Sequence, residues 1–186
     1  MPTLDLSKTT KDQRSEILKY ASEIRKFEIE RFWQRSLFFW GIIGAAFVGY
    51  AAAYPQKHDL IPLLIACFGL LCSVAWTLQN RGSKYWQEAW EQKVRAVEFE
   101  VLGTNLFSNW EPLQRKGPWG SAMFSVSKLA IAISDFTIFI WTALLIKAFP
   151  QSEWGKPIAN WAVLIVLVTV AFVFACFSPW GRTRNR

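Results

Sequence analysis

The fold is decided by three stretches without charge: SLFFWGIIGAAFVGYAAAYPQ (36–56), LIPLLIACFGLLCSVAWTLQN (60–80) and PIANWAVLIVLVTVAFVFACFSPWG (157–181). Asp, Glu, Lys and Arg are absent from all three, and each stretch has 21 residues or more. At a rise of 1.5 Å per residue, about 20 helical residues cross the roughly 30 Å hydrocarbon core of a bilayer. The stretches therefore predict membrane-spanning helices.

The composition of the whole chain points the same way. Hydrophobic residues make up 52% of the 186 residues, and charged residues make up 19%, compared with about 25% in soluble domains. This excludes a soluble globular enzyme, a disordered chain and a disulfide scaffold. The first apolar stretch follows a polar segment of 35 residues, so we expect it to stay as an anchor and not to be cleaved as a signal peptide.

We predict an all-α integral membrane protein with four transmembrane helices in two hairpins. The spans are 37–54, 60–78, 129–149 and 161–177, and the links within each hairpin are short and turn-rich. The predicted organisation is a cytoplasmic amphipathic helix (1–35), a transmembrane hairpin (36–78), a cytoplasmic helix with an interfacial link (79–128), a second transmembrane hairpin (129–177) and a basic cytoplasmic tail (178–186).

The distribution of Lys and Arg predicts the orientation. Of 21 such residues, 18 lie before the first span, between the second and third spans, or after the fourth. Because loops rich in Lys and Arg stay in the cytoplasm, both termini and the middle segment are predicted to be cytoplasmic, in a multi-pass protein of the bacterial inner membrane. The net charge of +7 favours contact with anionic lipids at the cytoplasmic face. Nucleic acid is not an expected partner, since acidic residues are interleaved with the basic ones.

Two amphipathic segments, 11–35 and 83–102, continue the first two spans into the cytoplasm. Apolar residues recur in them at spacings of three and four, which is typical of helices with one apolar side. These stripes are Ile17, Tyr20, Ala21, Ile24 and Phe27 in the first segment and Trp86, Trp90, Val94, Val97 and Val101 in the second. We predict two long antiparallel helices, with Gly103 ending the second.

The aromatic residues of these stripes are candidate contacts between subunits. Trp86 and Trp90 lie one turn apart, and Ile24 and Phe27 on the other helix cover only part of such a surface. Large exposed apolar side chains on a polar helix usually form a binding surface, so we expect a neighbouring subunit to cover the part of Trp86 and Trp90 that α1 leaves exposed. The alternative is an isolated two-helix stalk whose stripes pack only on each other.

Within the spans, one carboxylate and a row of small residues are notable. Asp135 lies inside the third span, where a charge is costly and usually faces a bundle interior or a wet cavity. Lys128 precedes it by two turns on the same face. The alternatives are a pore-lining or proton-sensing carboxylate, a buried polar tie, and a span that begins after Asp135. Gly41, Ala45 and Gly49 recur every four residues, which favours close helix packing, first against span two and second between subunits.

No catalytic, metal or cofactor site is predicted. The sole histidine, His58, lies in a short link, where a solvated turn is the simpler interpretation. The three cysteines lie inside apolar stretches and are interpreted as small buried residues. Serine, histidine and acidic residues, or cysteine and histidine, cannot be placed together in one compartment. We therefore expect a protein that is not an enzyme.

The stretch NRGSKYWQEAWE (80–91), together with Glu98, Glu100 and FSVSK (124–128) at the opening of span three, resembles the RipA family of octameric bacterial inner-membrane proteins. The similarity covers roughly residues 15–150. It implies a homo-oligomer of eight subunits in a family linked to growth inside host cells and to stress adaptation, but it supplies no biochemical activity. A weaker similarity is to two-span SLATT-type membrane effectors of bacterial defence systems.

These observations favour a non-enzymatic, homo-oligomeric membrane scaffold or assembly protein. The alternative is an oligomeric channel or a membrane-perturbing effector. A further protein partner is left open, because the residues do not identify one.

Overall fold

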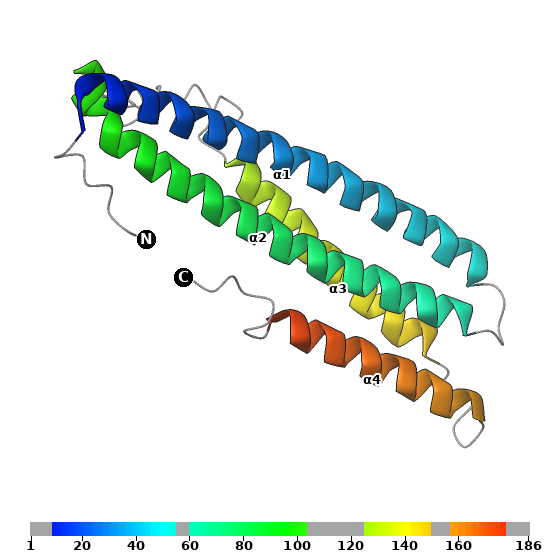
Figure 1. Cartoon of the computed structure of the whole chain (residues 1–186). Helices are drawn as coiled ribbons and strands as arrows, with labels where there is room; N and C mark the ends of the chain where they lie inside the picture. Colours follow the sequence, from blue (N-terminus) through cyan, green and yellow to red (C-terminus); the bar gives the residue numbers. More distant parts are fainter. Residues whose placement is uncertain (1–8, 55–59, 104–124, 150–156, 178–186) are drawn as a thin grey trace, which may run out of the picture. The chain divides into compact units, whose positions relative to one another are not determined.

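The computed structural model describes residues 9–54, 60–103, 125–149 and 157–177, which form helices and no strands (Figure 1). The helices of this part of the chain are α1 (Lys11–Ala53), α2 (Ile61–Leu102), α3 (Val126–Ala148) and α4 (Pro157–Phe177). All four are long and apolar enough to cross a membrane. The prediction of an all-α fold with four membrane helices is confirmed.

The ends of the two long helices follow from local sequence. Before α1, the Gln13 N–H donates to Thr10 Oγ1 at 3.3 Å and the Thr10 N–H donates to Gln13 Oε1 at 2.9 Å. This reciprocal pair is a capping box, which satisfies donors that the first helical turn leaves open. After α2, Gly103 adopts a φ of 65° and its N–H donates to the Phe99 carbonyl at 3.0 Å. Glycine adopts this left-handed conformation without a steric penalty, so the predicted stop at Gly103 is confirmed.

Three parts of the sequence-based prediction lie outside the described residues. They are the interfacial link within 104–124, the turn that holds His58 and the basic tail 178–186.

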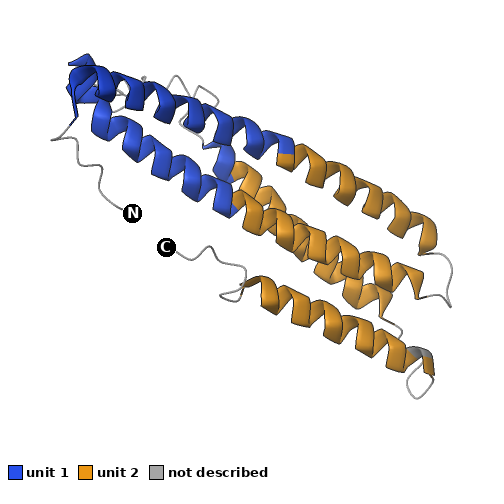
Figure 2. Ribbon diagram, viewed as in Figure 1, with its two compact units in different colours: residues 1–34, 81–128 blue, residues 35–80, 129–186 orange. Residues whose placement is uncertain are grey.

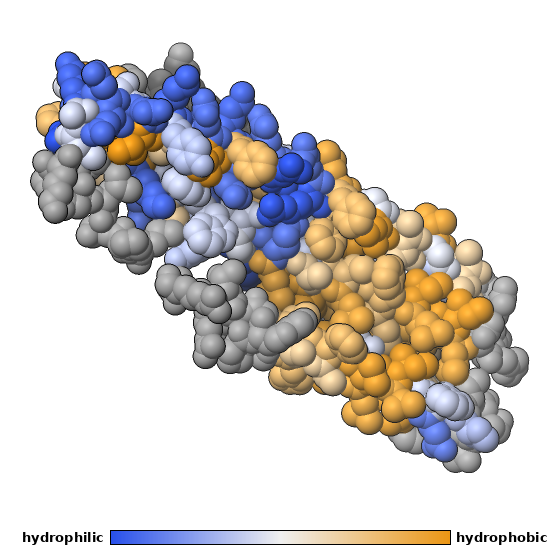
Figure 3. Space-filling model, in the orientation of Figure 1, coloured by the Kyte–Doolittle hydropathy of each residue, from blue (hydrophilic) through white to orange (hydrophobic). Residues whose placement is uncertain are grey.

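The chain divides into two compact units (Figure 2). Unit 1 comprises residues 1–34 and 81–128, and unit 2 comprises residues 35–80 and 129–186. On the face drawn in Figure 3, hydrophilic side chains gather over unit 1 and hydrophobic side chains over unit 2. The separation of charged and apolar stretches along the sequence is therefore also a separation between the units.

The core of unit 2 is built around one tryptophan. Trp141 of α3 is completely buried; its ring stacks on Phe47 with centroids 4.4 Å apart and meets Tyr50 edge to face at 6.1 Å. Gly69 of α2 lies directly against the indole, and a methyl group at that position would overlap the ring. The Tyr50 hydroxyl donates to the Leu144 carbonyl at 3.1 Å. Thus the absence of a side chain at Gly69 is what lets the tryptophan enter between the helices.

The fourth helix of unit 2 packs through a small residue. Ala162 of α4 is fully buried against Leu63 and Cys67 of α2. Small residues let helix backbones approach closely in lipid, where hydrophobic burial between helices gives little driving force. Ala162 therefore positions α4 on the bundle in the same way that Gly69 positions α3.

Candidate functional site

In unit 1, α1 and α2 run antiparallel and are joined by two ion pairs. Arg14 Nη1 lies 2.6 Å from Glu100 Oε2, and Arg25 Nη2 lies 3.2 Å from Glu91 Oε1. Arg14 near the start of α1 thus pairs with Glu100 near the end of α2, and the pair Arg25–Glu91 follows the same antiparallel alignment. Ion pairs this close to solvent contribute little stability, so their main effect is to fix the register of the two helices.

The side of α1 that faces α2 is displaced by one residue from the predicted stripe. We call this side the inner face of α1; its residues are Leu18, Ala21, Arg25, Glu28 and Phe32, of which Ala21 and Phe32 are fully buried. Ala21 belongs both to this face and to the predicted stripe. The other residues of the stripe come one position earlier, and at 3.6 residues per turn one residue is a rotation of about 100°. We call this second side the outer face of α1, made of Ile17, Tyr20, Ile24 and Phe27.

The outer face keeps much of its aromatic surface in solvent. Tyr20 is 64% exposed and Phe27 is 48% exposed, whereas Ile17 and Ile24 are half-buried at the edge of the contact with α2. The Arg31 guanidinium lies over the Phe27 ring, 4.9 Å from its centroid. The two stripes therefore do not cover each other fully within the chain, as the sequence analysis expected.

The two tryptophans singled out on α2 differ in environment. Trp86 is 38% exposed and meets Tyr85 edge to face at 5.5 Å. Trp90 is half-buried, and Lys93 Nζ lies 3.9 Å from its ring centroid. Trp86 is thus the more accessible of the two for contact outside the chain.

Unit 2 contains a buried polar cluster that joins three helices. The Ser36 hydroxyl donates to Asn80 Oδ1, and Asn80 Nδ2 donates to Ser134 Oγ, both at 3.3 Å. Ser134 in turn donates to the Ile131 carbonyl at 2.8 Å. The side chains of Ser36, Asn80 and Ser134 are at most 2% exposed. Asn80 is the centre of this cluster, because its amide bonds α1 on one side and α3 on the other.

Sequence reasoning missed Ser36 and Asn80. It considered a buried polar tie only for Asp135. The sequence did offer one indication, since Asn80 is a polar amide at the end of an otherwise apolar span. Side-chain amides in membrane helices form hydrogen bonds with neighbouring helices.

The two charged residues singled out near the membrane lie in different units. Asp135 is half-buried on α3 in unit 2, beside Ser134, and has a polar partner. Lys128 is exposed in the first turn of α3 and belongs to unit 1. Helix α3 continues through Asp135 without a break, so the helix does not begin after this carboxylate.

The row of small residues on α1 contributes little packing within the chain. Gly41 and Ala45 are exposed, and nothing lies within 4 Å of a side-chain position built on Gly41. Gly49 contacts Ile65 of α2, since a methyl group there would lie 3.7 Å from Ile65 Cδ1. The buried side of this part of α1 instead carries Ala46 and Tyr50. Contact between subunits, the second use considered for the row, stays a prediction.

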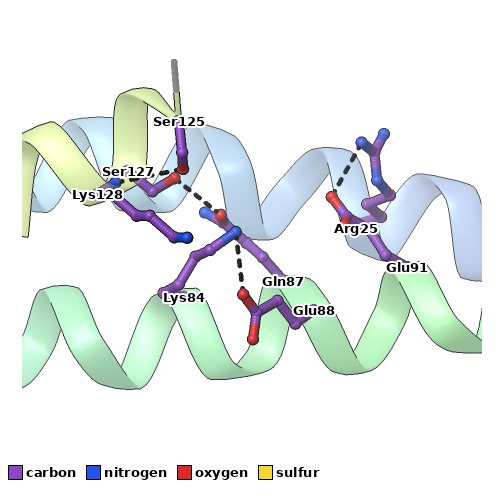
Figure 4. Close-up of polar contacts among 8 residues, drawn as sticks. All are labelled: Arg25, Lys84, Gln87, Glu88, Glu91, Ser125, Ser127 and Lys128. Carbon is purple, nitrogen blue, oxygen red and sulfur yellow. Dashed lines mark hydrogen bonds and ion pairs between the residues drawn. The ribbon is translucent and has the colours of Figure 1, made fainter. Parts of the chain in front are cut away.

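A further polar group joins α2 and α3 within unit 1 (Figure 4). The Ser127 hydroxyl donates to Gln87 Oε1 at 3.4 Å, and the Lys128 N–H donates to Ser125 Oγ at 3.4 Å. Lys84 Nζ lies 3.3 Å from Glu88 Oε1, one turn along the same helix. Two basic side chains, from α2 and from α3, are therefore present in one group.

The described residues contain no cluster of three or more His, Cys, Asp or Glu side chains that could hold a metal ion. What the described residues offer is exposed aromatic surface and polar ties between helices.

Comparison with known proteins gives the family. A model of the octameric membrane protein family (8xMP) matches residues 15–150, most of the chain. No curated protein and no solved structure matches the chain. The matched residues include nearly all of α1, all of α2 and α3, and both aromatic stripes. The chain belongs to the octameric membrane protein family.

Proposed function

We propose that the protein is a non-enzymatic homo-oligomeric scaffold or assembly protein of the bacterial cytoplasmic membrane, and that unit 1 forms the contacts between its subunits. Family membership supports a homo-oligomer of eight. The four apolar helices support membrane insertion. The observation that carries the proposal is the aromatic surface that the inner packing of unit 1 leaves open.

Exposed aromatic residues lie on both helices of unit 1. On α1 they include Tyr20 and Phe27, and on α2 they include Trp86 and Phe99, the last 58% exposed. Soluble surfaces rarely leave such aromatic groups uncovered unless they bind a partner, and buried aromatic anchors dominate most interfaces. A second copy of the chain is the occupant that the family implies, since eight identical subunits assemble with closed symmetry.

The orientation of the proposal rests on charge. With 18 of 21 basic residues on one side of the predicted spans, unit 1 and both termini lie in the cytoplasm, where anionic lipids attract basic residues. A role in stress adaptation or in growth within a host comes from the resemblance to the RipA family. Reporter fusions at Asp59 and Glu153 should report the periplasm, and a cytoplasmic signal at either position would contradict this orientation.

The mass of the intact protein tests the assembly. Native mass spectrometry of the full chain, released from a mild detergent, should show eight copies. A monomer over the whole range of protein concentration would contradict the proposal.

The alternative, an oligomeric channel or membrane-perturbing effector, predicts a different result. Liposomes that contain the purified oligomer should hold an ion gradient if the protein is a scaffold. Rapid loss of the gradient would favour the channel.

A further inference from the structure

We propose that unit 1 binds the phosphate of an anionic phospholipid between Lys84 of α2 and Lys128 of α3. The inference deepens the proposed contact with anionic lipids by naming its residues, and it rests on the proposed membrane location.

Both lysines stand at the ends of predicted spans. Lys84 follows the uncharged stretch 60–80 by four residues, and Lys128 directly precedes the apolar residues of span three. Four helical residues correspond to about 6 Å. Lysine side chains at this depth extend their ammonium groups toward the headgroups while their methylene chains stay in apolar surroundings. The lipid phosphate is therefore within reach of both.

The two side chains reach into one space. The hydrogen bond between Ser127 and Gln87 holds α2 and α3 together next to both lysines. Figure 4 shows the Lys84 and Lys128 side chains extending from their helices into the space between α2 and α3. Two ammonium groups brought together in this way repel each other, and an anion between them removes that repulsion.

The described carboxylates balance only part of the charge of the two lysines. Lys84 has Glu88 as an ion-pair partner at 3.3 Å, and the Glu88 side chain is 54% exposed. In the described part of the chain, no carboxylate is found within ion-pair distance of Lys128. The two lysines and Glu88 together therefore carry a net positive charge, which favours an anion between the lysines.

The neighbouring side chains suit a lipid better than a free ion. Tyr85 follows Lys84 and is 51% exposed, and Val126 precedes Lys128 by two residues and is 57% exposed. Tyrosine is favoured at the boundary between headgroups and acyl chains, and valine offers apolar surface. A phosphate that carries acyl chains uses all four residues, whereas inorganic phosphate uses only the lysines.

The test is thermal unfolding of the purified full chain in detergent micelles that contain phosphatidylglycerol or phosphatidylcholine. Phosphatidylglycerol should raise the unfolding temperature of the native sequence more than phosphatidylcholine does. In the variant K84Q/K128Q, the apparent affinity for phosphatidylglycerol should fall roughly thirty-fold, as expected for two lysines at a lipid surface. K84R/K128R should keep most of the affinity.

The matched control is K19Q/K26Q, which removes two exposed lysines of α1 and changes the net charge by the same amount. It should bind phosphatidylglycerol as the native sequence does. An equal loss in both variants, or no preference for phosphatidylglycerol in the native sequence, would overturn the proposal. So would an equal stabilisation by inorganic phosphate in phosphatidylcholine micelles. Light scattering on the same samples should show an unchanged oligomer in K84Q/K128Q, so that a failure here is distinct from a failure of the proposed assembly.

Discussion

Unit 1 and unit 2 hold their helices together by different means. In unit 2, a tryptophan fits against a glycine and an asparagine ties three helices, so shape and polar bonds determine the packing. In unit 1, the inner face of α1 combines the buried Ala21 and Phe32 with charged residues, and the aromatic residues Tyr20 and Phe27 are left on the outside. Apolar surface alone therefore does not determine which side of a helix packs within its own chain.

The reason lies in the solvent around each unit. In lipid, apolar side chains on the outside cost nothing, so the exposed Phe172 and Phe174 of α4 need no partner. In water, exposed aromatic side chains are unfavourable, so Tyr20 and Phe27 of unit 1, which are 64% and 48% exposed, do need one. The same degree of exposure thus has opposite meanings in the two units.

The largest expected effect breaks the packing of unit 2. Gly69→Ala should destabilise the protein by about 1–3 kcal/mol, because the added methyl group overlaps the Trp141 ring in a core without room. Thermal unfolding followed by tryptophan fluorescence measures the loss. The control is Gly44→Ala, where nothing lies within 4 Å of the new methyl group, and an equal response of the two variants would contradict the packing described for Trp141.

A smaller effect is expected at the polar cluster. Asn80→Ala removes the hydrogen bonds to Ser36 and Ser134 and should cost about 1–2 kcal/mol, since bonds between membrane helices contribute modestly. Thr142→Ala is the control, because Thr142 bonds only to the Ile138 carbonyl of its own helix and is exposed. If Asn80→Ala unfolds at the same temperature as the control, Asn80 is not a tie between helices.

The smallest effect is expected in unit 1. Arg25→Glu places a like charge beside Glu91 and should cost less than about 1 kcal/mol, because the pair is partly exposed. The exchange R25E/E91R should restore the lost stability at low salt, and high salt should reduce the difference. A loss as large as that of Gly69→Ala would mean that unit 1, like unit 2, depends on specific internal contacts.

Much of the fold could be predicted from the sequence because its signals are local. Three of the four membrane helices were predicted from the three uncharged stretches, and Gly103 marked the end of α2 through capping chemistry that needs no tertiary contact. The inner face of α1 could not be predicted, because the choice between two sides 100° apart depends on what α2 offers. The contacts of α1 with α2, such as the pair of Arg25 with Glu91, are not encoded in the spacing of residues within α1.

The candidate site was predicted in part for the same reason. The spacing of the aromatic residues in unit 1 could be predicted from the sequence. The difference between the exposed Trp86 and the half-buried Trp90 could not, because it depends on how the two helices are aligned. Asn80 and Ser36 are 44 positions apart along the chain, so their pairing has no local signal. The contacts assigned to Trp86, Trp90, Ile24 and Phe27 between subunits stay a prediction.

The most direct test of the account is the oligomer mass of two matched variants. F27A/W86A removes exposed aromatic residues from unit 1, and F172A/F174A removes exposed aromatic residues from unit 2. Size-exclusion chromatography with light scattering in mild detergent gives the subunit number of each. The account predicts that F27A/W86A dissociates and that F172A/F174A keeps the mass of the native oligomer. An intact oligomer in F27A/W86A together with dissociation of F172A/F174A would contradict it, because the membrane helices would then hold the subunits together.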